Sequence, residues 1–234
     1  MLTAEAVEFA VVYEDADLIV VDKPPGLVVH PGGGRLTGTL AGGLLHRYPE
    51  LEGVGDHARW GLVHRLDKDT SGLMVVARTE EAYRALVATI KGRLVRRQYL
   101  ALIEGRPASR SGTIDAPLGR DRRVPERRAV GGRGGREART HFEVLELLPH
   151  DALVEARLET GRTHQVRAHF AAIGHPVAGD PRYGHAGRHG LGRQFLTAPG
   201  SASGIRSRER GSSSSHRCPR TSKLRWPAPA MPDP

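Results

Sequence analysis

The apolar segments of this chain are short, and most are joined by turn-forming residues rather than by helices. Val11–Val12 and Leu18–Asp22 flank an acidic turn, Asp15–Asp17, and both have the composition of β-strands. Further strands are predicted at Leu73–Ala77, Gln98–Glu104, Phe142–Leu148 and Leu153–Glu159. Strands joined by turns pair antiparallel, whereas a doubly wound parallel sheet needs a helical crossover at each step. The pattern therefore predicts a mixed α+β fold.

Three segments have the apolar spacing of helices. They are Thr39–Tyr48, Glu80–Ile90 and His164–Ile173, and Thr163 is predicted to cap the last of them. Arg120–Arg139 is basic and contains several glycines, so it is predicted to be a long loop.

Several classes of protein are excluded by simple features of the chain. A single cysteine, Cys218, rules out an intramolecular disulfide. Met1–Val12 carries acidic residues and no basic region, unlike a secretory signal. No apolar run approaches the about 20 residues that span a bilayer. We therefore expect a cytoplasmic protein with no membrane segment.

The net charge of +9 is unevenly distributed. Residues 91–140 hold fourteen Lys/Arg against five Asp/Glu. A basic stripe of this kind suits a polyanion, because each neutralised phosphate releases counterions. A solvated surface explains the same charges equally well, so charge alone leaves both interpretations open.

The stretch Val63–Leu73 places Asp67 in a polar turn between apolar segments. Arg65 and Lys68 flank it, and nearby cations favour the carboxylate form that acts as a nucleophile. Read from the residues alone, Asp67 is equally a turn or capping residue.

The stretch Leu158–His169 contains Arg162 and Arg167 near a predicted helix start. Their guanidinium groups, together with free backbone N–H groups, suit a phosphate or a carboxylate. His164 and His169 are five residues apart and no carboxylate completes a ligand set, so no metal site is expected.

These motifs belong to a longer resemblance. The matching blocks are YEDADLIVVDKPPGLVVHP at 13–31, HRLDKDTSGLMVVA at 64–77, RQYLALIEG at 97–105, REARTHFEVLE at 136–146, LETGRTHQVRAHFAAIGHPVAGDPRYG at 158–184 and RQFL at 193–196. The second block resembles the HRLDxxTSG signature of the RluA/RluD-type large-subunit ribosomal RNA pseudouridine synthases, and the six blocks occur in that family's order.

The resemblance implies a fold and a chemistry. The fold would be that of a pseudouridine synthase: a mixed, mainly antiparallel sheet with flanking helices and a central RNA-binding cleft. Asp67 would be the nucleophile that attacks the target uridine, so that the base leaves, rotates and rejoins through C5. Tyr99 would pack against the base and is a candidate for removing the C5 proton. Arg65 would fill the space of the flipped nucleotide, and Arg167, in preference to Arg162, would pair with Asp67.

The resemblance also implies the partners of the site. The substrate would be RNA, with large-subunit ribosomal RNA as the expected target and transfer RNA as the alternative. The residues expected to bind it are His64, Arg65, Thr70, Ser71, Arg162, His164 and Gln165. Flipping suits this chemistry, because an enzyme cannot reach its target atoms in a stacked base. No metal, organic cofactor or obligate protein partner is implied, and we expect a monomer.

The chain departs from the family at both ends. RluD-like members often begin with an RNA-binding module of the S4 type, and here the catalytic domain is expected at residues 1–196 with no such module before it. Residues 197–234 are rich in Ser, Pro and Arg, and their composition predicts disorder. When this tail is translated back into ordinary codons and read from the third base of each codon, much of it resembles the C-terminal strand and turn that the family has and that this chain lacks. We hypothesise a frameshift near residue 197, which a gene sequence with no insertion or deletion there would refute.

Two other functions share some of these features. A non-catalytic RNA-binding or ribosome-assembly protein would keep the basic loop and would not need Asp67. A hydrolase with a carboxylate nucleophile would need a second carboxylate, for which Asp69 is the candidate. The hydrolase leaves the matched tyrosine and arginines without a role.

Overall fold

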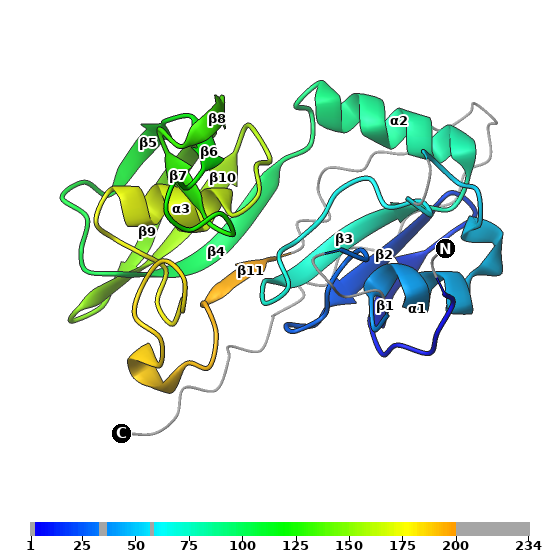
Figure 1. Ribbon diagram of the computed structural model, residues 1–234, viewed down its shortest axis with the longest axis horizontal. Coiled ribbons are helices and arrows are strands. Elements are labelled where there is room, and N and C mark those ends of the chain that lie inside the picture. Colours follow the sequence, from blue (N-terminus) through cyan, green and yellow to red (C-terminus); the bar gives the residue numbers. More distant parts are fainter. Residues whose placement is uncertain (1–2, 33–36, 57–58, 200–234) are drawn as a thin grey trace, which may run out of the picture. The chain divides into compact units, whose positions relative to one another are not determined.

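The computed structural model describes residues 3–32, 37–56 and 59–199, which lie within one compact unit, Met1–Gly204 (Figure 1). Its helices are α1 (Leu40–Arg47), α2 (Glu80–Lys91) and α3 (Gln165–Ala172), with short 3-10 turns at Pro49–Leu51 and Arg188–Gly190. Its strands are β1 (Ala10–Glu14), β2 (Leu18–Lys23), β3 (Ser71–Ala77), β4 (Arg97–Glu104), β5 (Ser111–Asp115), β6 (Leu118–Arg120), β7 (Arg128–Val130), β8 (Arg133–Arg136), β9 (Arg139–Leu147), β10 (Asp151–Leu158) and β11 (Leu196–Ala198).

Eight of these strands form one sheet in the order β1-β2-β3-β11-β4-β10-β9-β5. All neighbours pair antiparallel except β11 and β3, which are parallel. The mixed, mainly antiparallel sheet expected from the sequence is therefore confirmed. β11 is only three residues long, and it is the strand that joins the β1-β2-β3 half to the β4-β10-β9-β5 half (Figure 1).

The first two helices begin where the sequence predicts, and each has a threonine cap. The Oγ1 of Thr39 accepts a hydrogen bond from the N–H of Gly42 at the start of α1, and Thr79 accepts from Ala82 at the start of α2. Glu80 and Glu81 lie in the first turn of α2, where the helix dipole favours negative charge.

The start of α3 differs from the prediction that Thr163 caps it. The N-cap is His164, which has φ 56° and ψ 23° and makes no capping hydrogen bond through its side chain. A left-handed residue turns the chain sharply into the helix, so Thr163 lies outside the position from which a side chain can cap. The cap prediction was wrong because no local pattern shows that His164 takes this conformation.

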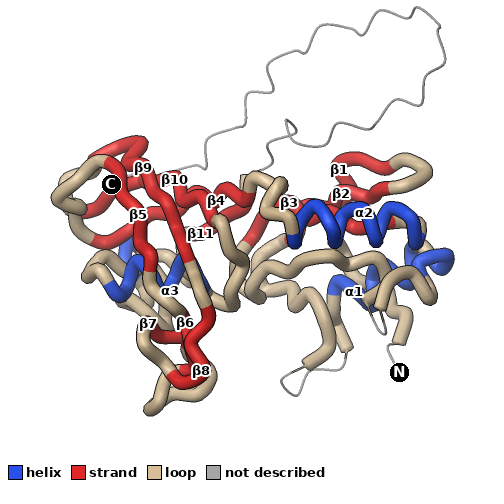
Figure 2. The backbone as a smooth tube through the Cα atoms, turned by 90° about the horizontal axis from the view of Figure 1, so that it is seen from above, coloured by secondary structure: helices blue, strands red, loops and turns tan. Residues whose placement is uncertain are grey.

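The basic segment predicted as a loop at Arg120–Arg139 is also different. It contains β7 and β8, which pair on either side of β6 in a separate three-stranded antiparallel sheet (Figure 2). Gly119 and Gly132 allow this close pairing, because a Cβ on Gly119 would lie 2.3 Å from the Gly132 carbonyl oxygen. Of the glycines that suggested a loop, Gly134 and Gly135 lie in β8, and Gly131 and Gly132 lie in the turn between β7 and β8.

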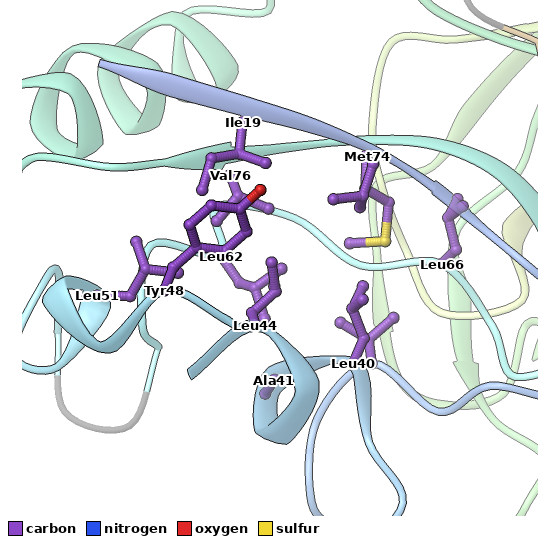
Figure 3. Packing of buried hydrophobic residues seen from close by; sticks show 12 residues of the cluster. Ile19, Leu40, Ala41, Leu44, Tyr48, Leu51, Leu62, Leu66, Met74 and Val76 are labelled. Carbon is purple, nitrogen blue, oxygen red and sulfur yellow. The ribbon is translucent and has the colours of Figure 1, made fainter. Parts of the chain in front are cut away.

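Two hydrophobic clusters flank the junction in the large sheet. In the first, Leu40 and Leu44 of α1 pack against Met74 and Val76 of β3 (Figure 3). The second joins α3 to β4, β9 and β10. Tyr99 of β4 packs against both clusters, so it lies where the two halves of the sheet meet.

The predicted boundary at residue 196 falls inside β11. Thr197 and Ala198, assigned to the tail from sequence, pair with Ser71 and Gly72 of β3. The remainder of the predicted disordered and frameshifted tail, residues 200–234, lies outside the described residues.

Candidate active site

Asp67 lies in the turn that precedes β3. The N–H of Thr70 donates to the Asp67 carbonyl oxygen at 3.1 Å and closes the turn. Lys23 of β2 holds the same turn and is fully buried. Its Nζ donates to the carbonyl oxygens of Pro24, Leu27 and Lys68, each at 2.9 Å. Burial lowers the pKa of Lys23 to about 8, against the effect of the nearby Asp69 and Asp67 carboxylates. The backbone around Asp67 is thus anchored from a separate strand.

Arg167 of α3 reaches Asp67 across a hundred residues of sequence. Its Nη1 donates to the Asp67 Oδ2 at 3.1 Å, while its Nε and Nη2 donate to the two carboxylate oxygens of Asp180 at 2.6 and 2.9 Å. Burial opposes the charge of Arg167, but the hydrogen bonds and charges of Asp180 and Asp67 outweigh it and raise the pKa of the guanidinium. The pairing expected from the resemblance is therefore present, with Arg167 rather than Arg162.

The two oxygens of Asp67 have different surroundings. Oδ2 accepts from Arg167, and Oδ1 has no hydrogen-bond partner among the described residues. The side chain is 18% exposed, so one oxygen is held by a fixed cation while the other can reach an incoming group. This geometry suits a carboxylate nucleophile that is oriented before the substrate arrives.

His164 and Tyr183 form a second layer around this pair. The His164 Nε2 lies 3.9 Å from the Asp67 Oδ2, and its Nδ1 lies 3.0 Å from the Tyr183 hydroxyl oxygen. Burial lowers the pKa of His164, so the neutral ring is favoured. The Tyr183 ring lies between two guanidinium groups, with the Cζ of Arg167 at 5.0 Å and that of Arg127 at 4.8 Å from its centroid.

Asp180 and Tyr183 are the functional candidates that the sequence analysis did not single out. Asp180 is fully buried, and its Oδ1 also accepts from the N–H groups of Arg182 and Tyr183. Both residues lie in the matched block Gly179–Gly184, so the signal was present, but nothing in the spacing shows that they contact Arg167.

Tyr99 and Arg65 lie at the site without a fixed partner. Burial, together with the Asp67 carboxylate, raises the pKa of Tyr99 to about 12, so its phenol is protonated at neutral pH. The Arg65 side chain is exposed, and no hydrogen bond or ion pair holds it within the described part of the chain. Arg65 is therefore free to move toward a bound ligand.

Three predicted substrate-binding residues are used inside the protein. The His64 Nε2 accepts from the N–H of Val75, and burial lowers the pKa of this histidine to about 4. The Gln165 amide makes four hydrogen bonds, to Thr160, Arg162, Arg139 and Thr140. Thr70 is 2% exposed and is 3.5 Å from the Gln194 Nε2. The hydrogen bonds of these three side chains within the protein help to hold the backbone around the site, and their contact with substrate stays a prediction.

Ser71 and Arg162, two further residues predicted to bind substrate, make different contacts. The Ser71 Oγ is 3.5 Å from an Arg193 nitrogen, and the Arg193 Nη1 also donates to the Asp69 carbonyl oxygen at 3.1 Å. Arg162 donates from its Nε to the Glu137 carbonyl oxygen at 2.9 Å, which leaves its terminal nitrogens without a hydrogen bond to the described residues. Arg162 can therefore contact a ligand directly.

Within residues 3–32, 37–56 and 59–199, no group of three or more His, Cys, Asp or Glu is placed to hold a metal ion. His169, considered above for its spacing from His164, is buried against Thr140 and the Ala116 carbonyl oxygen. None of the helices in this part of the chain is both long and apolar enough to cross a membrane.

Known proteins with similar sequences and structures agree on one family. Residues 17–172 match the model of the family described as RNA pseudouridylate synthase. The chain is 49% identical over 181 residues to the uncharacterized RNA pseudouridine synthase YlyB of Bacillus subtilis, covering 77% of this chain and 59% of that protein. It is 50% identical over 181 residues to ribosomal large subunit pseudouridine synthase D of Nitrosomonas europaea, covering 77% of this chain and 51% of that protein.

Among solved structures, human RNA Pseudouridylate Synthase Domain Containing 1 superposes with a TM-score of 0.67 at 29% identity, covering 85% of this chain and 79% of that one. The chain spans between half and two thirds of the length of the curated relatives named above. The matched residues contain Asp67, Tyr99 and Arg167, the centre of the site. The chain belongs to the RNA pseudouridylate synthase family.

Proposed function

We propose that this chain converts uridine to pseudouridine in RNA, with Asp67 as the nucleophile. The observation that carries the proposal is the Asp67 carboxylate, with Oδ2 held by Arg167 at 3.1 Å and Oδ1 unpartnered among the described residues. A buried guanidinium holds the carboxylate in one orientation, so little reorganisation is needed when the substrate binds.

The reaction is an isomerisation, so its atoms balance without a cofactor. Asp67 attacks the ribose or the base, the bond between C1′ of the ribose and N1 of uracil breaks, and the base rotates within the site. A bond then forms between C1′ and C5, and the bond between the substrate and the Asp67 carboxylate breaks, which restores the free carboxylate. The C5 proton leaves, and N1 gains a proton. No electron acceptor is required, in agreement with the expected absence of a cofactor.

We propose that Tyr99 packs against the base, and its position on β4, in contact with both hydrophobic clusters, supports this role. With a pKa of about 12, only about one phenol in 10⁵ is ionised at pH 7. A general base works best when its pKa is near the working pH. Tyr99 can therefore pack against the base with its phenol protonated. To remove the C5 proton, the phenol must first ionise more readily, so the bound substrate would have to lower its pKa.

Arg65 and Arg162 are the proposed contacts to the RNA outside the reacting base. Arg65 is exposed and unpaired among the described residues, so it can enter the space that a flipped nucleotide leaves in the stack. The terminal nitrogens of Arg162 make no hydrogen bond to the described residues, so they are available to the RNA. His164, close to Asp67, is placed to contact the ribose or the base of the target nucleotide.

We propose large-subunit ribosomal RNA as the substrate, with transfer RNA as the alternative. The support is that a relative 50% identical to this chain is named ribosomal large subunit pseudouridine synthase D. The exposed arginines of the three-stranded sheet, including Arg133 and Arg136, add a basic surface suited to an RNA backbone. A cytoplasmic location, a monomeric state and independence from a protein partner remain predictions.

The test is tritium release from RNA that carries [5-³H]uridine, with large-subunit ribosomal RNA and bulk transfer RNA as separate substrates. Release by the wild-type chain, with none from Asp67→Asn, supports the proposal. Binding of both proteins to RNA without any release would instead favour a binding protein. Appearance of free uracil rather than pseudouridine would favour a hydrolase.

The control for folding is Arg157→Gln, which removes an exposed guanidinium on β10 whose ion pairs, to Glu143 and Glu155, are both 3.5 Å long. This variant is expected to release tritium like the wild type. An equal loss in Asp67→Asn and Arg157→Gln would show that the assay responds to general damage rather than to the nucleophile.

A further inference from the structure

Arg97 lies next to the active site and has no role in the mechanism above. It is two residues before Tyr99 on β4, and residues two apart on a strand point to the same face of the sheet. The positive charge of Arg97 influences both Tyr99 and His64, which places the guanidinium close to each of them.

The guanidinium of Arg97 is only partly satisfied by the protein. Its Nη2 donates to the Glu159 carbonyl oxygen at 3.0 Å, but its Nε is buried with no hydrogen-bond partner. The Glu159 carboxylate is engaged elsewhere, with Arg139 at 2.9 Å and His141 at 2.7 Å. Across the described residues Arg97 makes no ion pair with any carboxylate. A charge held this way is unfavourable unless a ligand completes it.

The neighbours of Arg97 are mainly cations. Burial and the charges of Arg162 and Arg93 lower the pKa of Arg97. Burial and the charges of Arg136 and Arg93 likewise lower the pKa of Arg162, against the effect of the Glu137 carboxylate. Such a group of guanidiniums binds an anion more readily than it binds a neutral base or sugar.

The backbone beside Arg97 is shaped to admit its guanidinium. A Cβ at Gly161 would lie 2.3 Å from the Arg97 Nη1, so any larger residue there would displace the guanidinium. Gly161 directly precedes Arg162, which has free terminal nitrogens. One glycine therefore lets Arg97 lie beside the segment that carries Arg162.

We propose that Arg97 and Arg162 bind a backbone phosphate of the RNA next to the target uridine. The proposal rests on the proposed function, because it assumes an RNA substrate whose base packs on Tyr99. A phosphodiester adjoining that nucleotide is the anion nearest to the base, and the planar fork of arginine matches two phosphate oxygens. Arg97 would then fix the position of the flipped nucleotide through its backbone.

The test couples a change in the protein to a change in the RNA. Binding is measured in the Asp67→Asn background for a short target RNA and for versions with one methylphosphonate, a neutral phosphate analogue, on either side of the target uridine. We expect Arg97→Gln to weaken binding to the unmodified RNA about 10- to 100-fold. We also expect the slope of log affinity against log salt to fall by about one.

A methylphosphonate at one of the two positions should weaken RNA binding by the parent protein by a similar factor. RNA binding by Arg97→Gln should hardly change with the same substitution in the RNA. Arg157→Gln is the matched control. Arg157 pairs in register with Gln98, so its side chain points to the face of the sheet opposite to that of Arg97. RNA binding by this variant should remain sensitive to the methylphosphonate. Arg97→Lys keeps the charge and should keep part of the sensitivity.

Equal methylphosphonate sensitivity in the parent and in Arg97→Gln at both positions would overturn the proposal and leave Arg97 a structural residue. The same conclusion follows if Arg97→Lys, still folded by its thermal midpoint, loses binding without any change in salt slope. The proposed function fails separately, if wild-type protein releases no tritium. The coupling measurement uses binding alone, so it does not depend on that result.

Discussion

Replacing Gly72 by alanine tests how strongly the large sheet depends on the short strand β11. Gly72 is the second residue of β3 and has φ +122°, and it pairs with Ala198 of β11. A Cβ at this position would lie 2.6 Å from the Ala198 nitrogen and closer still to its carbonyl oxygen. Both contacts are to backbone, so no side-chain rotation can relieve them, and β11 must move away from β3.

The expected loss of stability has two parts. Forcing extra volume into a packed position costs about 1–3 kcal/mol, and a non-glycine residue at this φ costs a further ~1–3 kcal/mol. Together they amount to about 2–6 kcal/mol, against a total stability of about 5–15 kcal/mol. For a domain of this size the thermal midpoint should fall by about 4–24 °C. Turnover should fall too, because Gly72 follows directly on the turn that carries Asp67.

The assay is thermal unfolding of Gly72→Ala beside Gly131→Ala. Gly131 also has a positive φ, +68°, but a Cβ there would meet no atom within 4 Å. This control should lose only about 1–2 kcal/mol from backbone strain. A midpoint for Gly72→Ala no lower than that of Gly131→Ala would refute the idea that contact with β11 limits this position.

Three further substitutions test the surroundings of Asp67. Asp180→Asn keeps the shape of the side chain but removes the negative charge that holds Arg167, so single-turnover rates should fall about 10- to 100-fold. Rates within twofold of wild type would contradict a positioning role for Asp180. Tyr99→Phe should keep RNA affinity and lose about 10²- to 10⁴-fold in turnover if the hydroxyl takes part in proton transfer; unchanged turnover would leave Tyr99 with packing alone. Buried Lys23 loses its proton near pH 8, and an unfolded lysine does so near its ordinary value of 10.5. The unfolded chain therefore binds more protons than the folded chain between these pH values. The free energy of unfolding, measured in urea, should rise with pH in wild type relative to Lys23→Met, by about 1.4 kcal/mol per pH unit. A difference between the two proteins that does not change with pH would contradict this.

The arrangement of the sheet followed from local patterns to a useful extent. The strands β2, β3 and β4 and the helices α1 and α2 were predicted within a few residues, because their apolar periodicity and threonine caps are local features. The small sheet β6-β7-β8 was missed, since its glycines serve close strand pairing as well as the turn between β7 and β8. A pattern of glycines does not distinguish these two uses.

The active site was predictable in part for a similar reason. The partnership of Asp67 with Arg167 came from family resemblance, and the structure brings the two side chains together. Asp180 and Tyr183 could not be assigned by spacing, because their contacts to Arg167 depend on how the chain returns to α3 after residue 174. His64 and Gln165 were expected to bind substrate, yet their hydrogen bonds are used within the fold.

The segment that leads into β11 also holds the turn that carries Asp67, the proposed nucleophile. Arg193 donates to the Asp69 carbonyl oxygen at 3.1 Å, and the Thr197 Oγ1 donates to the Ser71 carbonyl oxygen at 3.2 Å. Movement of β11 would therefore reach the Asp67 turn directly, through bonds to its backbone. If residues 197–234 do result from a frameshift, a chain that carries the alternative reading frame should extend the pairing of β11 beyond Ala198. We expect that chain to have both a higher thermal midpoint and a higher turnover than the chain as written. Equal midpoints and equal turnover for the two chains would show that three residues of β11 are sufficient to hold the two halves of the sheet and the Asp67 turn in place.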